Sequence, residues 1–330
     1  MIDTVPIPNL SIVLPGMCDV KCTFCTWRNG ATSGVKAHDK YLERIDYILN
    51  TLPDQFISIS LTGGEPLLSP YLWPVLDLID KNRWERVGLT TNATNLAPSI
   101  LDRLSEKLNF INISRHHYDD SINEKIFDSA IVPKTDQLAK INQYAYNVGI
   151  PVSYNTVLTK HFPAKKSEIE KMVKFAFQTN AQRVNFRKIQ GPKTTTAPSS
   201  HEAMYLNDPT YVNYPCPVCR TADTRVGNMT VSWKAAVLEP SIHLGYWFEG
   251  VVHPSGVLSG DWDGTMPGEP EDLKVIDTVY EDEELVITRS ELSQIVSEIL
   301  SEQSNGSTPT AQKYGSRDTS GKCGSGGCGP

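Results

Sequence analysis

Short apolar runs alternate with longer amphipathic segments through the first two thirds of the chain. Residues 38–52 place Leu42, Ile45, Ile48 and Leu49 on one helical face. Four further segments share this pattern, at 69–82, 98–108, 135–148 and 166–180. The apolar runs are typical of buried strands and occur at 10–14, 56–61, 85–91, 109–114, 151–158 and 183–189. The alternation predicts a β/α repeat.

A β/α repeat with short connections indicates a parallel sheet with right-handed crossovers. Six such units are too few to close an eight-stranded barrel. We therefore expect an α/β fold built as a partial (β/α)6 barrel that is open on one side. In barrels of this kind, functional residues lie on the loops at the C-terminal ends of the strands.

The alternation of apolar runs and amphipathic segments ends near residue 192. There the Thr/Ser/Pro-rich segment 191–200 resembles a linker. Residues 229–240 predict a strand, and 246–264 predict a hairpin that turns at Pro254-Ser255-Gly256. An amphipathic helix is expected at 290–300, followed by a Gly/Ser-rich tail. We therefore expect a barrel over 1–200, a small mostly-β C-terminal extension over 201–303 and a flexible Gly/Ser/Cys tail over 304–330.

Composition narrows the class of protein. The net charge is −7, whereas proteins that bind nucleic acids usually carry an excess of basic residues. No nucleic-acid partner is therefore expected. There is neither an apolar stretch of membrane-spanning length nor a signal peptide, which favours a cytoplasmic protein without a membrane partner. Seven cysteines are an odd number and too sparse for a disulfide scaffold. Metal or redox chemistry is the better interpretation.

Cys18, Cys22 and Cys25 follow the first predicted strand with the spacing C-x3-C-x2-C. Structural zinc normally takes four protein ligands, and no fourth Cys or His lies at finger spacing beside them. Three thiolates suit an iron–sulfur cluster that keeps one iron open to an exogenous ligand. The alternative, three buried thiols, is less favoured because this Lys-containing loop offers no core to fill.

The stretch CDVKCTFC (18–25) resembles the C-x3-C-x-Φ-C motif of the radical S-adenosylmethionine (SAM) superfamily, with Phe24 as the aromatic residue. After the second strand, TGGEP (62–66) is similar to the family's GGEP loop, which holds the amino group of SAM. Taken alone, GGEP would indicate a turn before a helix. Two motifs at the ends of consecutive strands identify the chain as a member of the superfamily, in the branch that resembles the molybdenum-cofactor cyclase and the SPASM proteins.

The resemblance covers about residues 8–191 and includes TTNA (90–93), which is similar to a T-N-G loop with Ala93 in place of glycine. It implies cofactor-binding roles for Phe24, Gly63, Gly64, Glu65, Pro66, Ser114, Asn155 and Arg187. Arg115 is a further candidate beside Ser114. Alternatively, these polar groups inside the barrel only form hydrogen bonds with one another. We expect His116 and His117 to be solvated or hydrogen-bonded loop residues, with an acid or base beside the substrate as the alternative.

The family resemblance implies a [4Fe–4S] cluster on Cys18, Cys22 and Cys25 that chelates SAM. One electron, from a donor such as flavodoxin or ferredoxin, would cleave SAM to a 5′-deoxyadenosyl radical that abstracts hydrogen from the substrate. We expect a small-molecule or natural-product substrate. A peptide maturase is the alternative, less favoured because the first strand begins almost at residue 8 and leaves no room for a leader-peptide domain. A metal-stabilised binding module without catalysis is the outside alternative.

Four cysteines lie outside the first motif. Cys216 and Cys219 form a C-x2-C pair, and Cys323 and Cys328 lie in the tail. The C-x2-C pair before a hairpin resembles the SPASM and twitch extensions, although GDWDG stands where another cysteine is usual. Four thiols suffice for an auxiliary cluster or a zinc site. A tail dithiol that shuttles reducing equivalents, or no role beyond flexibility, are the alternatives.

Overall fold

The structure is a computed structural model that describes residues 9–22, 24–25, 37–51, 58–158, 166–188, 212–213, 222–234, 242–243, 246–247 and 249–259. The predicted linker, the helix at 290–300, the tail and the four cysteines Cys216, Cys219, Cys323 and Cys328 lie outside these residues. Their predicted roles therefore remain predictions.

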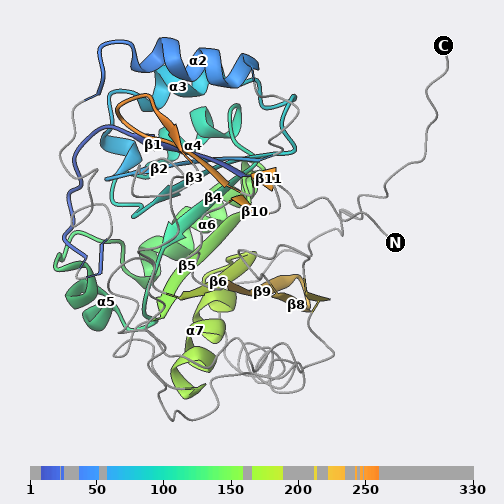
Figure 1. Cartoon of the computed structure of the whole chain (residues 1–330). Helices are drawn as coiled ribbons and strands as arrows, with labels where there is room; N and C mark the ends of the chain where they lie inside the picture. The colour runs from blue at the N-terminus through green and yellow to red at the C-terminus, as the bar shows by residue number, and fades with distance from the viewer. Residues whose placement is uncertain are drawn as a thin grey trace, which may run out of the picture.

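Eleven strands form one sheet in the order β13-β12-β1-β2-β3-β4-β5-β6-β9-β8-β7 (Figure 1). The six predicted strands are β1 (Asn9–Leu14), β2 (Ser58–Gly63), β3 (Arg86–Thr91), β4 (Phe110–Ser114), β5 (Val152–Leu158) and β6 (Arg183–Lys188). Each is parallel to its neighbour in the series. The two edge strands do not pair with one another among the described residues, so the barrel is open, as predicted.

Later strands extend this sheet at both edges. β12 (Glu249–Val252) pairs with β1 in parallel and turns back as β13 (Leu258–Ser259), which confirms the predicted hairpin. At the opposite edge, β9 (Met229–Lys234) pairs with β6 in parallel and continues the sheet through β8 (Ala222–Val226) and β7 (Val212–Asn213). A separate pair is formed by β10 (Ile242–His243) and β11 (Tyr246–Trp247). The mostly-β C-terminal part is thus continuous with the barrel sheet.

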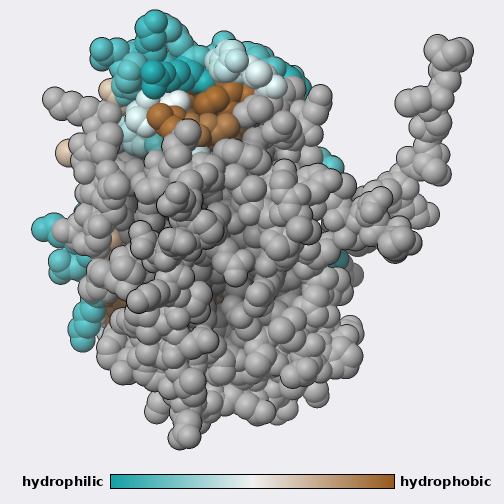
Figure 2. Space-filling model, in the orientation of Figure 1, coloured by the Kyte–Doolittle hydropathy of each residue, from teal (hydrophilic) through white to brown (hydrophobic). Residues whose placement is uncertain are grey.

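Helices cover one side of the sheet, with α2 and α3 together at one end of the molecule and α7 at the other (Figure 1). Their bounds are α2 (Tyr41–Thr51), α3 (Leu72–Leu78), α4 (Pro98–Ser105), α5 (Asp120–Phe127), α6 (Thr135–Asn147) and α7 (Lys166–Gln178). None of the described helices has the length and apolar character needed to cross a membrane. Figure 2 shows hydrophilic side chains over the region of α2, as expected for a helix with one buried face.

The two sides of the inner strands differ in chemistry. In β1, Leu10, Ile12 and Leu14 belong to the apolar core that the helices cover. The alternate position Asn9 accepts hydrogen bonds from Ser58 and Ser60 of β2, with oxygen–oxygen distances of 2.6 and 2.9 Å. Since side chains alternate along a strand, the apolar set faces the helices and the polar set faces the concave side.

The helix α5 was not predicted from the sequence. It is eight residues long and begins at the cap residue Asp119, whose carboxylate accepts from the Ile122 amide at 3.1 Å. It ends at Asp128, which has a left-handed φ of 49°.

Candidate active site

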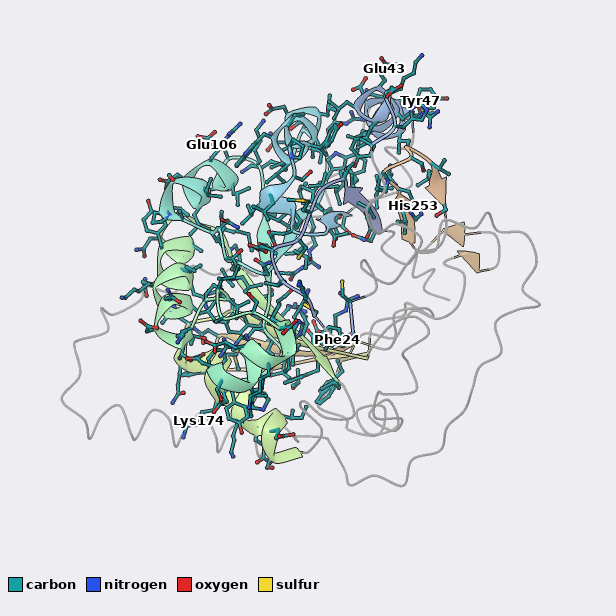
Figure 3. All side chains as sticks on the ribbon, turned by 90° about the vertical axis from the view of Figure 1, so that its left-hand side faces the viewer. Phe24, Glu43, Tyr47, Glu106, Lys174 and His253 are labelled. Carbon is teal, nitrogen blue, oxygen red and sulfur yellow. The ribbon has the colours of Figure 1, made fainter. Side chains whose placement is uncertain are left out.

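The loops that follow β1 to β4 and the C-terminal halves of β5 and β6 surround one cavity of about 220 Å³. The predicted site residues on its wall are Cys18, Cys22, Phe24, Cys25, Gly63, Gly64, Glu65, Ser114, Asn155 and Arg187. Figure 3 shows Phe24 on the side of the sheet away from the helices near Glu106 and Lys174. Pro66 does not line the cavity; it is the buried first residue of the short 3₁₀ helix η1 (Pro66–Leu68). The structure therefore brings together every predicted site residue except Pro66.

The cysteine loop is held by backbone hydrogen bonds to two other segments. The Met17 carbonyl accepts from the Glu65 amide at 2.9 Å, and the Lys21 amide donates to the Phe127 carbonyl of α5 at 2.8 Å. Beneath the loop, Val20 packs with Phe127 and Val132, and Cys18 and Cys22 contact this small apolar cluster. The loop is therefore fixed against both the GGEP loop and the unpredicted helix α5.

The three thiols are free of disulfides and partly exposed on the cavity wall. Burial raises the pKa of Cys18, the Val20 amide lowers it, and the nearby Glu65 carboxylate raises it further. No three His, Cys, Asp or Glu side chains in the described part of the chain converge on one point as they would around a single metal ion. A [4Fe–4S] cluster instead takes each thiolate at a different iron. Three thiols spread along one wall fit that donor set.

Glu65 is buried, with 2% of its surface exposed, and its carboxylate joins two loops. One oxygen, Oε1, accepts from the Leu67 amide at 3.1 Å and from the Thr91 hydroxyl at 2.6 Å. The other, Oε2, accepts from the Asn92 amide at 2.8 Å. A carboxylate has about four acceptor positions, so one remains for a ligand. Burial raises the pKa of Glu65 to about 7, against these three hydrogen bonds, which lower it.

Gly63 allows the backbones of β1 and β2 to approach closely at the start of the two motif loops. It pairs with Leu14 where β1 and β2 run side by side, and its φ is +148°. A Cβ atom at Gly63 would lie 2.4 Å from the Leu14 carbonyl oxygen. Only glycine fits there, so this residue sets how closely the two motif-bearing strands approach.

The loop after β3 contacts both motifs. The Asn92 side chain donates from Nδ2 to Oδ1 of Asp19 at 2.6 Å, and the Thr94 hydroxyl donates to Oδ2 of Asp19 at 2.6 Å. Ala93, which stands where the family has glycine, has a left-handed φ of 64°. Asn92 lies in the TTNA stretch that resembles a T-N-G loop, but neither Asn92 nor Asp19 was predicted as a site residue. The signal available was weak: an acidic residue between two cysteines and a polar run, TTNATN, after a strand.

The wall from β4 to β6 is polar. Asn155 on β5 accepts at Oδ1 from Asn185 Nδ2 at 2.9 Å, and Ser114 and Arg187 also line the cavity. The candidate Arg115 does not reach the site, which corrects that prediction. Its buried guanidinium donates to the Pro133 carbonyl at 3.1 Å and pairs with Asp120 at 2.5 Å. Successive residues of a strand point to opposite sides, so Ser114 and Arg115 diverge.

His116 and His117 are both buried and hydrogen-bonded, which agrees with the expectation of solvated or hydrogen-bonded loop residues in its second form. His116 lines the cavity, stacks on Phe127 and meets Phe24 edge-on, each with ring centroids 4.9 Å apart. Its Nδ1 accepts from the Val157 amide at 3.2 Å. Burial, with the Arg115 charge, lowers the pKa of His116 to about 3, so the ring is neutral near pH 7. His117 accepts from the Asp119 amide at 3.0 Å and lies away from the cavity lining.

Comparison with known proteins agrees with this geometry. Residues 12–176, half of the chain, match the family model of the radical SAM superfamily. A GTP 3′,8-cyclase of Picosynechococcus sp. is 31% identical over 164 residues, which cover 46% of this chain and 48% of that protein. An S-adenosylmethionine-dependent nucleotide dehydratase of Flammeovirga pacifica is 27% identical over 163 residues, 47% of this chain and 54% of that protein. The chain spans about half the length of the curated relatives it matches.

Among solved structures, Streptococcus suis SuiB bound to the precursor peptide SuiA aligns with a TM-score of 0.54 and 17% identity over 78% of this chain and 60% of that one. This similarity supports the fold alone. The family match covers both motif loops and four of the six central strands complete, β2 to β5. The chain therefore belongs to the radical SAM superfamily, resembles its GTP 3′,8-cyclase branch, and is an enzyme that uses a [4Fe–4S] cluster and SAM.

Proposed function

We propose that this enzyme holds its cluster on Cys18, Cys22 and Cys25 and abstracts a hydrogen atom from a small-molecule substrate bound in the same cavity. One observation carries the proposal: a single cavity is lined by all three thiols, by the GGE residues of the second loop and by polar side chains of four further strands, β3 to β6. When bound, the reduced cluster and SAM supply a 5′-deoxyadenosyl radical.

Different groups on the cavity wall suit different parts of the SAM molecule. The remaining acceptor position of Glu65, with the backbone of Gly63 and Gly64, suits the ammonium group of SAM. On the opposite wall, Ser114, Asn155 and Arg187 offer donors for its carboxylate or ribose. Apolar groups, among them Val20, Phe24, Phe127 and Val157, line the same cavity and exclude water from a reactive radical.

The electron for this chemistry comes, in our proposal, from a protein donor such as a flavodoxin or ferredoxin. Met17, next to Cys18, is 79% exposed, so the chain beside the first cysteine reaches the surface. We therefore propose that the donor approaches from the side of the cysteine loop.

The substrate class rests on weaker support. The curated relatives are named for reactions on nucleotides, which favours a small molecule, and they match this chain over only about half their length. A peptide substrate is the second candidate, because the similar SuiB structure contains a precursor peptide. The match to the radical SAM family model gives no support to the alternative of a binding module without catalysis.

The first test uses the whole protein purified without oxygen. We expect about four irons per chain on the first motif and release of 5′-deoxyadenosine when a reductant and SAM are added. Cys18→Ala, Cys22→Ala or Cys25→Ala should each abolish this release and lower the iron content, because the cluster loses one of three thiolates. Thermal unfolding should change little. Wild-type rates of 5′-deoxyadenosine release in any of the three variants would contradict the assignment.

The second part of the test separates the two substrate classes. Candidate nucleotides and peptides, deuterated at carbon, are incubated with the reduced enzyme and SAM. Deuterium in 5′-deoxyadenosine identifies the compound that loses the hydrogen atom. Transfer from peptides with none from nucleotides would replace the small-molecule proposal with the peptide alternative.

A further inference from the structure

We propose that Asp19 and Asn92 are a positioning pair that fixes the cysteine loop against the GGEP loop, so that one ligand can contact both. The inference rests on the proposed function, because it concerns the same cavity. Asp19 belongs to the cysteine loop, Glu65 to the GGEP loop, and Asn92 contacts both. The pair acts through the groups it positions.

The first half of the link is the side chain of Asn92. Its Nδ2 donates to Oδ1 of Asp19 at 2.6 Å, while the Thr94 hydroxyl donates to Oδ2 at 2.6 Å and Asn95 Nδ2 donates to Oδ2 at 3.2 Å. Hydrogen bonds to an ionised carboxylate are stronger than neutral ones. Asp19 is adjacent to Cys18, so the contact holds the start of the three-cysteine segment.

The second half of the link is the backbone of the same loop. The Asn92 amide donates to Oε2 of Glu65 at 2.8 Å, and the neighbouring Thr91 hydroxyl donates to Oε1 at 2.6 Å. Asn92 is itself buried, with 5% of its surface exposed. Thr91 at the end of β3 and Asn92 directly after it therefore bind the acidic groups of two different motifs.

The link lies beyond the point where the sheet itself sets the spacing. The pairing of β1 with β2 ends at Leu14 and Gly63, and the three cysteines and Glu65 all come after it. Beyond the sheet, a hydrogen bond from the Glu65 amide to the Met17 carbonyl also joins the two loops directly. Asn92 adds the contact to Asp19, inside the three-cysteine segment. Of the two carboxylates, that of Glu65 lines the cavity itself, where an anionic group suits the cationic SAM.

The experiment exchanges the two partners. Asn92→Asp sets two carboxylates against each other, and Asp19→Asn removes the charge that the loop binds. Each single variant should weaken SAM binding on the order of tenfold and speed the loss of iron to a chelator. The double variant Asp19→Asn/Asn92→Asp restores a donor facing an acceptor. It should recover SAM affinity to within about threefold of wild type, a coupling expected only of groups in contact.

A matched control is available on α2, where Asn50 Nδ2 donates to Asp46 Oδ1 at 3.0 Å in an exposed position. The exchange Asp46→Asn/Asn50→Asp and its single variants should leave SAM affinity and iron retention unchanged. Binding of SAM is measured by anaerobic calorimetry, iron release by chelator absorbance and stability by thermal unfolding. If the Asp19 and Asn92 variants lower only the melting temperature, or if the double variant shows no recovery, the positioning role is wrong. Wild-type protein that binds neither iron nor SAM would instead overturn the proposed function.

Discussion

At the scale of single residues, the contacts of Glu65 suit both of the functions that the sequence presented as alternatives. It caps η1 and binds the loop after β3, as a structural turn would require, and it also keeps one acceptor position on the cavity. The two interpretations are therefore compatible, because a carboxylate has more acceptor positions than the three donors use.

The raised pKa of Glu65 predicts how pH affects SAM binding. Burial raises it from 4.5 to about 7, and a ligand ammonium would favour the ionised form. SAM affinity should therefore increase as the pH rises through about 7, and it should increase less in Glu65→Gln. The amine of SAM titrates with both proteins, so the difference between their pH profiles isolates Glu65. Identical profiles would remove Glu65 from the ligand.

Stability of the ligand-free protein should follow the opposite trend. The folded-state pKa of Glu65 lies above its unfolded value, so the folded protein holds the proton more tightly between pH 4.5 and about 7. This group's contribution to the free energy of unfolding is therefore largest below pH 4.5 and falls as the pH rises to about 7. Glu65→Gln should lack that slope in denaturant unfolding measured across the range.

At the scale of elements, the sequence predicted all six central strands and the hairpin at Pro254–Gly256, because each is marked by a local pattern. Local patterns could not show that Asp19 and Asn92 meet, since these residues are far apart in sequence and join only when β1 and β3 are folded. The same limit applies to His116 and Arg115, which contacts with α5 and with the loop before α6 bury.

The contact between β1 and β2 gives a prediction about Gly63. Gly63→Ala forces a Cβ atom against the Leu14 carbonyl and also keeps a φ that alanine disfavours. We expect a loss of stability on the order of 3 kcal/mol. Gly149→Ala is the matched control, because Gly149 also has a positive φ of +83° but no described atom within 4 Å of the added Cβ. It should cost about 1 kcal/mol. Equal losses in denaturant unfolding would show that the close approach is unimportant.

At the scale of the whole molecule, the C-terminal strands support the two edges of the sheet that carries the site. β12 lies beside β1, which leads into the cysteine loop, and β9 lies beside β6, which carries Arg187. Trp233 of β9 is fully buried and stacks on Phe186 of β6 with centroids 4.9 Å apart. The predicted boundary at residue 200 therefore separates segments that share one sheet.

This arrangement predicts that residues 1–200 do not form a stable unit. Ending the chain there removes β12 from the outer edge of β1 and β9 from the outer edge of β6. It also leaves the Phe186 ring without Trp233. Unpaired strand edges favour aggregation, so the fragment should aggregate or unfold without a cooperative transition. A chain that ends at residue 303, where the predicted tail begins, should unfold with a midpoint close to that of the full chain. Circular dichroism with thermal unfolding compares the three proteins. A 1–200 fragment that unfolds cooperatively and binds SAM would show that the barrel needs neither edge strand, because the six central strands then suffice to form the site.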